Sequence, residues 1–341
     1  MAKELSSSFS SGFDANLIRA SIARDCLFDF VKEFWDTIIP EEPVYNWHIE
    51  YLCGQLQKLA ERVFKGLPKE EDLVINISPG TTKSSLCSIM FPAWCWTRMP
   101  HCRVISASYA HSLAMDLSRK SRDLVKSDKY RLYYPEIAIR EEQDTKSYYI
   151  NTKGGDRYAV GVKGSVTGMH AHFLIVDDPL DPNQAVSEAE LKAVNHWMTN
   201  TLPSRKVNKA VTPLILIQQP LHENDPAGAL LERKKQGKAK IFHVCLPAEL
   251  PPKTKCNVSP PELREKYIDR LMDPIRLSKD VLEEYKSTSA YAYSAQFQQS
   301  PVPATGGFFR EEFFNQRKKA APYNCVRVRY WDRASSVTEG S

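Results

Sequence analysis

The sequence predicts an α/β fold with three layers, in which helices cover both faces of a mainly parallel central sheet. The first observation is that short apolar, β-branched segments alternate with segments of helical spacing, the order expected for a parallel sheet. The second is that two of the apolar segments end in polar groups, and ligands of such sheets bind at the carboxyl ends of strands. The expected strands lie at 73–77, 103–108, 172–178, 211–219 and 241–245.

The composition is that of an ordinary globular protein. Of 341 residues, 42% are hydrophobic and 26% are charged, which allows two domains or one large domain with appendages. The net charge of +5 permits a polyanionic partner without requiring one. No apolar run approaches the ~20 residues of a membrane span. The eight cysteines include no C-x-x-C pair, which predicts a reducing cytoplasm and no structural zinc.

The chain divides into four predicted regions. Residues 1–45 contain a Ser-rich disordered tail and a helix over 17–39, and residues 46–246 form the α/β core. Prolines and short helices mark residues 247–300 as a small helical lid or linker subdomain, and residues 301–341 as a linker and one strand of a further domain. Further helices are expected at 109–128, 187–201, 225–235, 262–271, 279–287 and 290–299, and a hairpin at 148–163.

Residues 72–90 read DLVINISPGTTKSSLCSIM, a strand, a turn and a helix that opens with Lys83 and Ser84. This is the order of P-loop NTPases, in which helix N-terminal N–H groups bind phosphates, the Lys reaches the β and γ oxygens, and the hydroxyl holds Mg²⁺. The pattern G-x-x-x-x-G-K-[ST] is incomplete, because Ile77 and Thr82 replace its glycines, and an ordinary turn stays an alternative for this loop alone. The candidate nucleotide-binding residues are Ser78, Pro79, Gly80, Thr81, Thr82, Lys83, Ser84 and Ser85.

A second apolar strand ends in Asp177 and Asp178. In the Walker B element of an NTPase, the first Asp orders Mg²⁺ through water and the next carboxylate polarises the attacking water. Such a run also occurs by chance, but its position after Lys83, with one strand–helix unit between them, argues against chance. We therefore predict an ATPase of the RecA-like P-loop fold, with ATP and Mg²⁺ as ligands and Lys83, Asp177 and Asp178 as catalytic residues.

Other residues are weaker candidates for the same site. Tyr45 and Trp47, with His48, are candidates to border the adenine, and helix packing is the alternative. The polar end of the strand 211–219 falls beside the γ-phosphate if the sheet is parallel, which makes Gln218 and Gln219 candidates. The loop contains no Arg for the developing phosphoryl charge. The cations that could supply it are Lys163, Arg119, Arg122 and Arg205.

An ordered series of segments resembles the large subunit of tailed-phage terminases, the motor that packages DNA into procapsids. The segments span roughly residues 45–332, in the family's order. They are INISPGTTKSS, FPAWCWTRMP, SASYAHSLAMDLSRKSRDLVKSDKY, GVKGSVTGMHAHFLIVDDP, WMTNTLPSR, LHENDPAG and YSAQFQQSPVPATGGFF. The resemblance implies a phosphate-binding role for Lys83, a Mg²⁺-binding hydroxyl at Ser84 and a Walker B role for Asp177. Asp178 stands where many relatives have a catalytic Glu.

The resemblance also has implications outside the loop. Gln218 and Gln219 stand at the family's coupling motif, where many relatives have Thr or Ser followed by a residue and Arg. Tyr45 and Trp47 fall where the family contacts adenine. Asp332 resembles the first metal-binding aspartate of the RNase H-like nuclease domain, which needs two or three more carboxylates for two metal ions. Since the chain stops soon afterwards, we expect no DNA cleavage by this chain, although the full-length protein would cut.

The partners implied by the resemblance are double-stranded DNA, gripped mainly through its phosphates, the portal protein of the procapsid, and the small terminase subunit. The expected assembly is a homo-oligomeric ring of chains that can be monomeric in isolation, in the host cytoplasm and without membrane contact. Two alternatives stay open: a RecA-like helicase or translocase, and an assembly module that binds ATP with little turnover. The helicase would not explain the segment 293–309 or the strand that ends at Asp332.

Overall fold

The computed structural model describes residues 14–251, 257–301 and 326. All described residues except Val326 belong to one compact unit, Met1–Ala304. The predicted Ser-rich tail up to residue 13 and, apart from Val326, the strand predicted to end at Asp332 lie outside the described residues.

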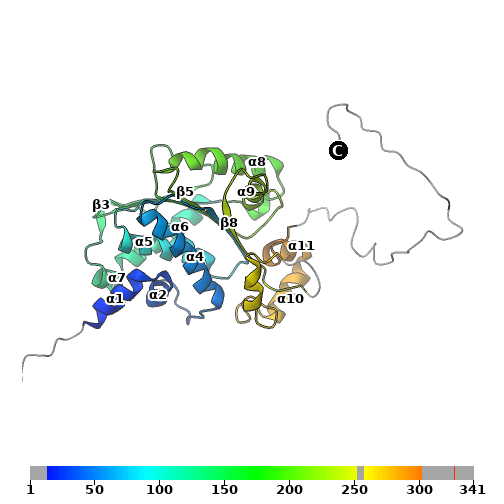
Figure 1. Ribbon diagram of the computed structural model, residues 1–341, viewed down its shortest axis with the longest axis horizontal. Helices are drawn as coiled ribbons and strands as arrows, with labels where there is room; N and C mark the ends of the chain where they lie inside the picture. Colours follow the sequence, from blue (N-terminus) through cyan, green and yellow to red (C-terminus); the bar gives the residue numbers. More distant parts are fainter. Residues whose placement is uncertain (1–13, 252–256, 302–325, 327–341) are drawn as a thin grey trace, which may run out of the picture. The chain divides into compact units, whose positions relative to one another are not determined.

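One eight-stranded sheet forms the middle layer, with the strand order β3-β4-β5-β2-β6-β7-β1-β8 (Figure 1). Each pair of neighbouring strands along β5-β2-β6-β7-β1-β8 is parallel, whereas β3 pairs with β4, and β4 with β5, in the antiparallel direction. The mainly parallel sheet is therefore confirmed. The strands are β1 Asp72–Ile77, β2 Val104–Ser108, β3 Ile139–Asp144, β4 Tyr148–Asn151, β5 Asp156–Gly161, β6 Phe173–Asp177, β7 Leu214–Gln218 and β8 Ile241–Leu246.

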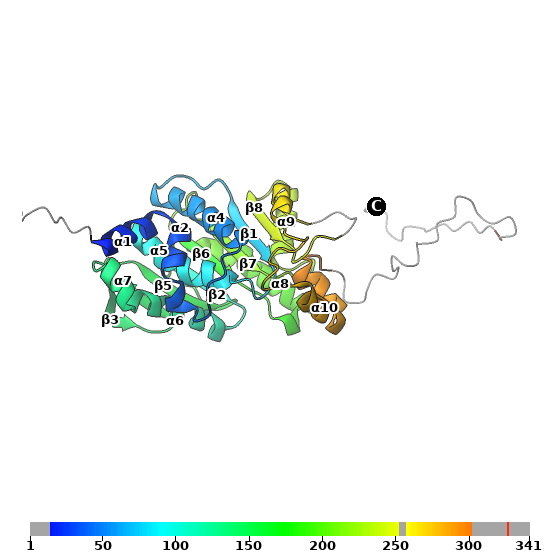
Figure 2. The ribbon, with the colours of Figure 1, turned by 90° about the horizontal axis from the view of Figure 1, so that it is seen from below.

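Helices cover both faces of this sheet, as Figures 1 and 2 show. One face carries α1 Ala15–Asp25, α2 Leu27–Glu33, α3 Trp35–Ile38, α4 Trp47–Phe64, α5 Phe91–Arg98, α6 His111–Lys126 and α7 Asp128–Tyr133. The other carries α8 Glu188–His196 and α9 Pro226–Lys235. Two separate hydrophobic cores result, and alternate residues of one strand enter different cores: Leu73 and Ile75 lie in one, Val74 in the other.

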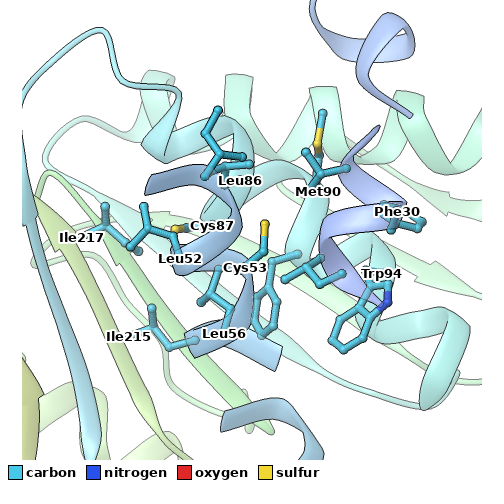
Figure 3. Close-up of a cluster of buried hydrophobic side chains, with 14 of the residues drawn as sticks. Phe30, Leu52, Cys53, Leu56, Leu86, Cys87, Met90, Trp94, Ile215 and Ile217 are labelled. Atoms are coloured by element: carbon cyan, nitrogen blue, oxygen red, sulfur yellow. The ribbon is translucent and has the colours of Figure 1, made fainter. Parts of the chain in front are cut away.

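The larger core fixes the helical segment that follows the loop after β1. Figure 3 shows Leu52 and Leu56 of α4 beside Ile215 and Ile217 of β7, with Leu86 in the same cluster. All five side chains are at most 1% exposed. Burial on both faces explains why the strands of this sheet are continuous apolar runs rather than alternating ones.

The described residues of the segment 247–300 form short elements. They are the 3₁₀ turn Pro261–Lys266, α10 Lys279–Thr288, α11 Ala290–Ala292 and the π-helical turn Tyr293–Phe297. Met272 and Phe297 are buried in the same hydrophobic cluster as α4. This segment therefore packs directly on the sheet-and-helix core. Within the described ranges, no helix is long and apolar enough to cross a membrane.

Two predicted helices differ from the structure. The helix expected over 17–39 breaks at Cys26, where the Gln57 side chain accepts from Leu27 N (2.9 Å) and donates to Asp25 O (2.8 Å). The side-chain amide of Gln57, which is distant in the sequence, thus replaces helical hydrogen bonds at this break. No local sequence pattern reveals such a contact. The helix expected over 262–271 ends at Lys266, because residues 269 and 270 adopt left-handed φ values of 51° and 71°.

Strand β3 was not predicted at all. Its sequence IREEQD is mostly exposed and lies at the edge of the sheet. It therefore lacks the apolar alternation that identifies a strand in a sequence, and charged residues are common on edge strands because they discourage pairing with other chains.

Candidate nucleotide-binding site

The loop between β1 and the next helix has the left-handed turns of a phosphate-binding loop. Gly80 has a φ of +74° and Thr82 a φ of +62°. Thr82 occupies the second Gly position of the pattern, so a β-branched residue stands in a conformation that only Gly adopts without strain. Ile77, at the first Gly position, is the last residue of β1 and is buried. Extended backbone suits any residue, so this departure carries no conformational cost.

Neutral hydrogen bonds hold the loop from beneath. Thr81 Oγ1 donates to Ser78 O (2.7 Å), and the Thr81 carbonyl lies 3.1 Å from His48 Nε2. Asn46 Nδ2 lies 2.8 Å from His48 Nδ1, which makes Nδ1 the acceptor and leaves the Nε2 proton for Thr81. Burial lowers the pKa of His48 to about 4, so the imidazole is neutral, as this arrangement requires.

The segment 247–300 reaches the same loop. Ser78 Oγ donates to Phe297 O (3.4 Å) and accepts from Gln299 Nε2 (3.4 Å). Asn46, which orients His48, also donates to Met272 O (2.7 Å). The loop is therefore tied to the predicted lid segment directly through the Ser78 side chain and indirectly through Asn46 and His48.

A hollow of about 310 Å³ opens above the loop, at the carboxyl edge of the sheet. Its lining unites the predicted loop with the ends of β6 and β7. The lining residues are Pro79, Gly80, Thr81, Thr82, Lys83, Ser84, Ser85, Asp178 and Gln219. Ser78 is the one predicted loop residue outside this lining, because it is buried beneath the loop.

Lys83 and Asp178 form an ion pair in this hollow, with Nζ 3.2 Å from Oδ2. Lys83 Nζ also donates to Gln219 Oε1 (3.4 Å). Asp178 has a left-handed φ of +43°, and its Oδ1 accepts from Gln219 N (3.1 Å). The second carboxylate is therefore oriented by the backbone at the end of β7 and by the Lys of the loop.

Asp177 is buried, at 2% exposure, beneath the same hollow. Its Oδ2 accepts from Ser88 Oγ (2.7 Å), while its Oδ1 has no hydrogen-bond partner among the described residues. Burial, and then the charge of Asp178, raise the pKa of Asp177 to about 6, and the nearby Ser84 hydroxyl opposes this shift. A buried carboxylate oxygen without a partner, beside a hydroxyl, fits the ligand preference of Mg²⁺.

The aromatic candidates lie away from the hollow. Tyr45 packs edge-on against Trp35, with ring centroids 5.3 Å apart, and its hydroxyl donates to Lys32 O. Trp47 Nε1 donates to Met272 O (3.0 Å), and its ring lies beside Tyr267. Neither residue lines the hollow. Helix α4 begins at Trp47 and turns His48, one residue later, toward the loop.

Gln218 is not brought to the hollow, whereas Gln219 is. Successive strand residues point to opposite sides, and Gln218 is buried, where it hydrogen-bonds to the Asp225 carboxylate and its own carbonyl accepts from Asn76. Both Gln residues were candidates for the γ-phosphate side, and the structure places Gln219, not Gln218, in the lining of the hollow.

The candidate cations are engaged elsewhere. Lys163 pairs with Glu190 (2.6 Å) on the first turn of α8. The α6 residues Arg119 and Arg122 pair with neighbouring acidic side chains, and Arg205 donates to Ser204 Oγ. Within the described part of the chain, Lys83 is the one basic side chain that lines the hollow.

Comparison with known proteins gives structural matches only. No protein-family model and no curated protein matches the chain. The HK97 bacteriophage large terminase matches with a TM-score of 0.49 at 14% identity, covering 81% of this chain and 55% of that chain. An ATPase-domain variant of the large terminase of Thermus phage P74-26 matches with a TM-score of 0.44 at 10% identity, covering 79% of this chain and 98% of that chain.

The large terminase of a thermophilic bacteriophage, in complex with ATP-gamma-S, matches with a TM-score of 0.40 at 13% identity, covering 70% of this chain and 50% of that chain. These structures come from the family that the sequence motifs resemble. The chain spans about half the length of the HK97 large terminase. The chain's own topology and loop place it among α/β folds of the P-loop NTPase type.

Proposed function

We propose that this chain is the ATPase motor of a phage large terminase, which hydrolyses ATP to move double-stranded DNA into a procapsid. The observation that supports this most directly is the meeting of Lys83 and Asp178 in one hollow. Asp177 lies buried directly beneath them. A lysine from the loop after β1 and two carboxylates at the end of β6 are the groups that phosphoryl transfer to water requires.

The geometry suggests how these residues divide the work. The N–H groups of the loop bind the phosphates, and Lys83 exchanges its partner Asp178 for a β or γ oxygen. Asp178 is then free to accept the proton of the attacking water, with Oδ1 still fixed by Gln219 N. Ser84 and Asp177 would hold Mg²⁺, which would neutralise charge on the phosphate oxygens.

The Lys83–Asp178 pair therefore links substrate binding to activation of the base. In the structure, Lys83 Nζ occupies Oδ2 of Asp178. Binding of the phosphates draws Lys83 away and leaves that oxygen free to accept a hydrogen bond from the attacking water. Gln219, which contacts both residues, is placed to respond to the γ-phosphate and to pass its presence to β7.

The partners belong to the same proposal. We propose a homo-oligomeric ring on the portal of the procapsid, with the small terminase subunit as a further partner. DNA would be held mainly through its phosphates, for example by the exposed basic end of α9, Arg233 to Lys235. A cation from a neighbouring chain would complete the ATPase site. For a longer protein with a complete nuclease domain, we propose Asp332 as a metal ligand.

Steady-state ATP hydrolysis by the wild type and by Lys83→Ala, with DNA and portal present, tests the proposal. We expect the wild type to turn over ATP and Lys83→Ala to lose the activity. Equal rates in the two proteins would refute the motor. ATP binding without turnover in the wild type would instead favour an assembly module.

A further inference from the structure

Two buried charges near the site have no ion-pair partner among the described residues. Arg157 of β5 is 1% exposed and Asp177 is 2% exposed. Leaving a charge in the interior without a counter-ion is costly, and such groups are retained where hydrogen bonds and function use them. Because an arginine stays protonated in proteins, the Arg157 cation must be stabilised by its surroundings.

Ser88 connects the two charges. Arg157 Nη2 donates to Ser88 O (2.6 Å), and Ser88 Oγ donates to Asp177 Oδ2 (2.7 Å). One residue thus contacts the cation through its carbonyl and the anion through its hydroxyl. Burial lowers the pKa of Arg157, and the Tyr149 side chain and then the Asp177 charge oppose this shift, so the interaction between Arg157 and Asp177 is attractive.

Ser88 lies in the π-helical turn Ser85–Met90 that follows the loop. A π turn displaces backbone carbonyls from the regular helical ladder, and such turns are frequent at functional sites. Here two successive carbonyls accept from distant side chains: Ser88 O from Arg157, and Ile89 O from Ser121 Oγ (2.8 Å) of α6. The turn is therefore held in place from β5 and from α6.

We propose that Arg157 is a positioning residue for the nucleotide site, which acts through Ser88 to hold Asp177 in the orientation that serves Mg²⁺. This inference rests on the proposed function. Arg157 fixes the Ser88 backbone, the Ser88 hydroxyl occupies Oδ2 of Asp177, and Oδ1 is the oxygen left for the metal and its water. Partners that orient a metal ligand in this way affect metal affinity by about 10–100-fold.

The test measures binding of a fluorescent, non-hydrolysable ATP analogue by anisotropy, with Mg²⁺ and with EDTA. We expect Arg157→Gln and Ser88→Ala each to weaken Mg²⁺-dependent binding about tenfold, and binding in EDTA to be unchanged. Because Arg157 acts through Ser88, the double variant should lose no more than the larger single loss, a strongly non-additive result. Arg157→Lys, which keeps a donor and the charge, should recover part of the affinity.

Ser121→Ala is the matched control, because it removes the other hydrogen bond to the same turn, at Ile89 O, and Ser121 has no hydrogen bond to Ser88 or Asp177. It should lower thermal stability and leave the Mg²⁺ dependence intact. Additive losses, or unchanged Mg²⁺ dependence in Arg157→Gln, would overturn the inference while the proposed function stands. Absence of nucleotide binding by the wild type would overturn both. If Arg157→Gln does not fold, Ser88→Ala and Arg157→Lys provide the test. Unchanged Mg²⁺ dependence of nucleotide binding in Ser88→Ala would then overturn the inference.

Discussion

The loop after β1 and the end of β6 meet in one hollow but are held by different means. The loop is held by neutral hydrogen bonds, from His48 to the Thr81 carbonyl and from Ser78 to the Phe297 carbonyl. It carries conformational strain at Thr82. The end of β6 is held by charge, through Lys83 and through the network beneath Asp177. We infer that the contacts of the loop residues before Lys83 set the stability of the site, whereas Lys83 and the carboxylates at the end of β6 set its chemistry.

The largest effect is expected from Asp178→Asn. Removal of the carboxylate should lower kcat by about 10²–10⁴-fold, the range for loss of a general base. The free energy of unfolding should also fall, because the mostly buried Lys83 loses its counter-ion, although the amide still accepts from Gln219 N. Steady-state kinetics and denaturant unfolding measure the two quantities. Asp181→Asn, just downstream and outside the hollow, is the control, and an equal loss of activity in both variants would contradict the assignment.

On the loop side, His48→Leu should act mainly on stability. It leaves the buried Thr81 carbonyl without its donor, which costs about 1–3 kcal/mol in the free energy of unfolding. His48→Gln keeps an amide donor near that carbonyl and serves as the matched control. Urea unfolding at pH 7 would report the difference, and equal stability of the two variants would show that the hydrogen bond to Thr81 contributes nothing.

The same histidine predicts a pH dependence of stability. The pKa of His48 is lowered to about 4 from 6.5, so between these values the unfolded chain binds a proton at His48 and the native chain does not. The free energy of unfolding therefore falls as pH drops through this window, by on the order of 2–3 kcal/mol from this residue. His48→Gln should lose that share, and an unchanged pH profile would argue against a buried neutral His48. The pKa values of His172 and His243 are also lowered to about 4. These two residues should therefore retain the remaining pH dependence of stability in the His48→Gln variant.

The smallest effect is expected from Thr82→Gly. It should raise the free energy of unfolding by about 1 kcal/mol, because relief of the left-handed strain outweighs the added freedom of Gly in the unfolded chain. Thr82→Ala, which keeps a Cβ and part of the strain, should gain less. Thermal unfolding would show the order Gly, Ala, Thr, and destabilisation by Gly would mean that the Thr82 side chain supports the loop.

Much of this site could be predicted from short stretches of sequence. The β-branched runs, Lys83 with Ser84, and the Asp177–Asp178 pair were each recognised locally, because a strand, its terminus and the following turn are encoded by neighbouring residues. The sheet then placed them together, since parallel strands bring their carboxyl ends to one edge. The missing glycines were explained only by backbone angles: Ile77 belongs to the strand, and Thr82 accepts a strained φ.

Other features depended on contacts between residues far apart in the chain. The end point of β7 decides that Gln219 rather than Gln218 faces the hollow. Tyr45 lies away from the hollow because it packs on α2 and α3. The sequence by itself determined the mainly parallel α/β sheet and the loop and strand ends that line the hollow. Only the tertiary structure brought Arg157 to Ser88, because that contact depends on how β5 packs against a helix encoded 69 residues earlier.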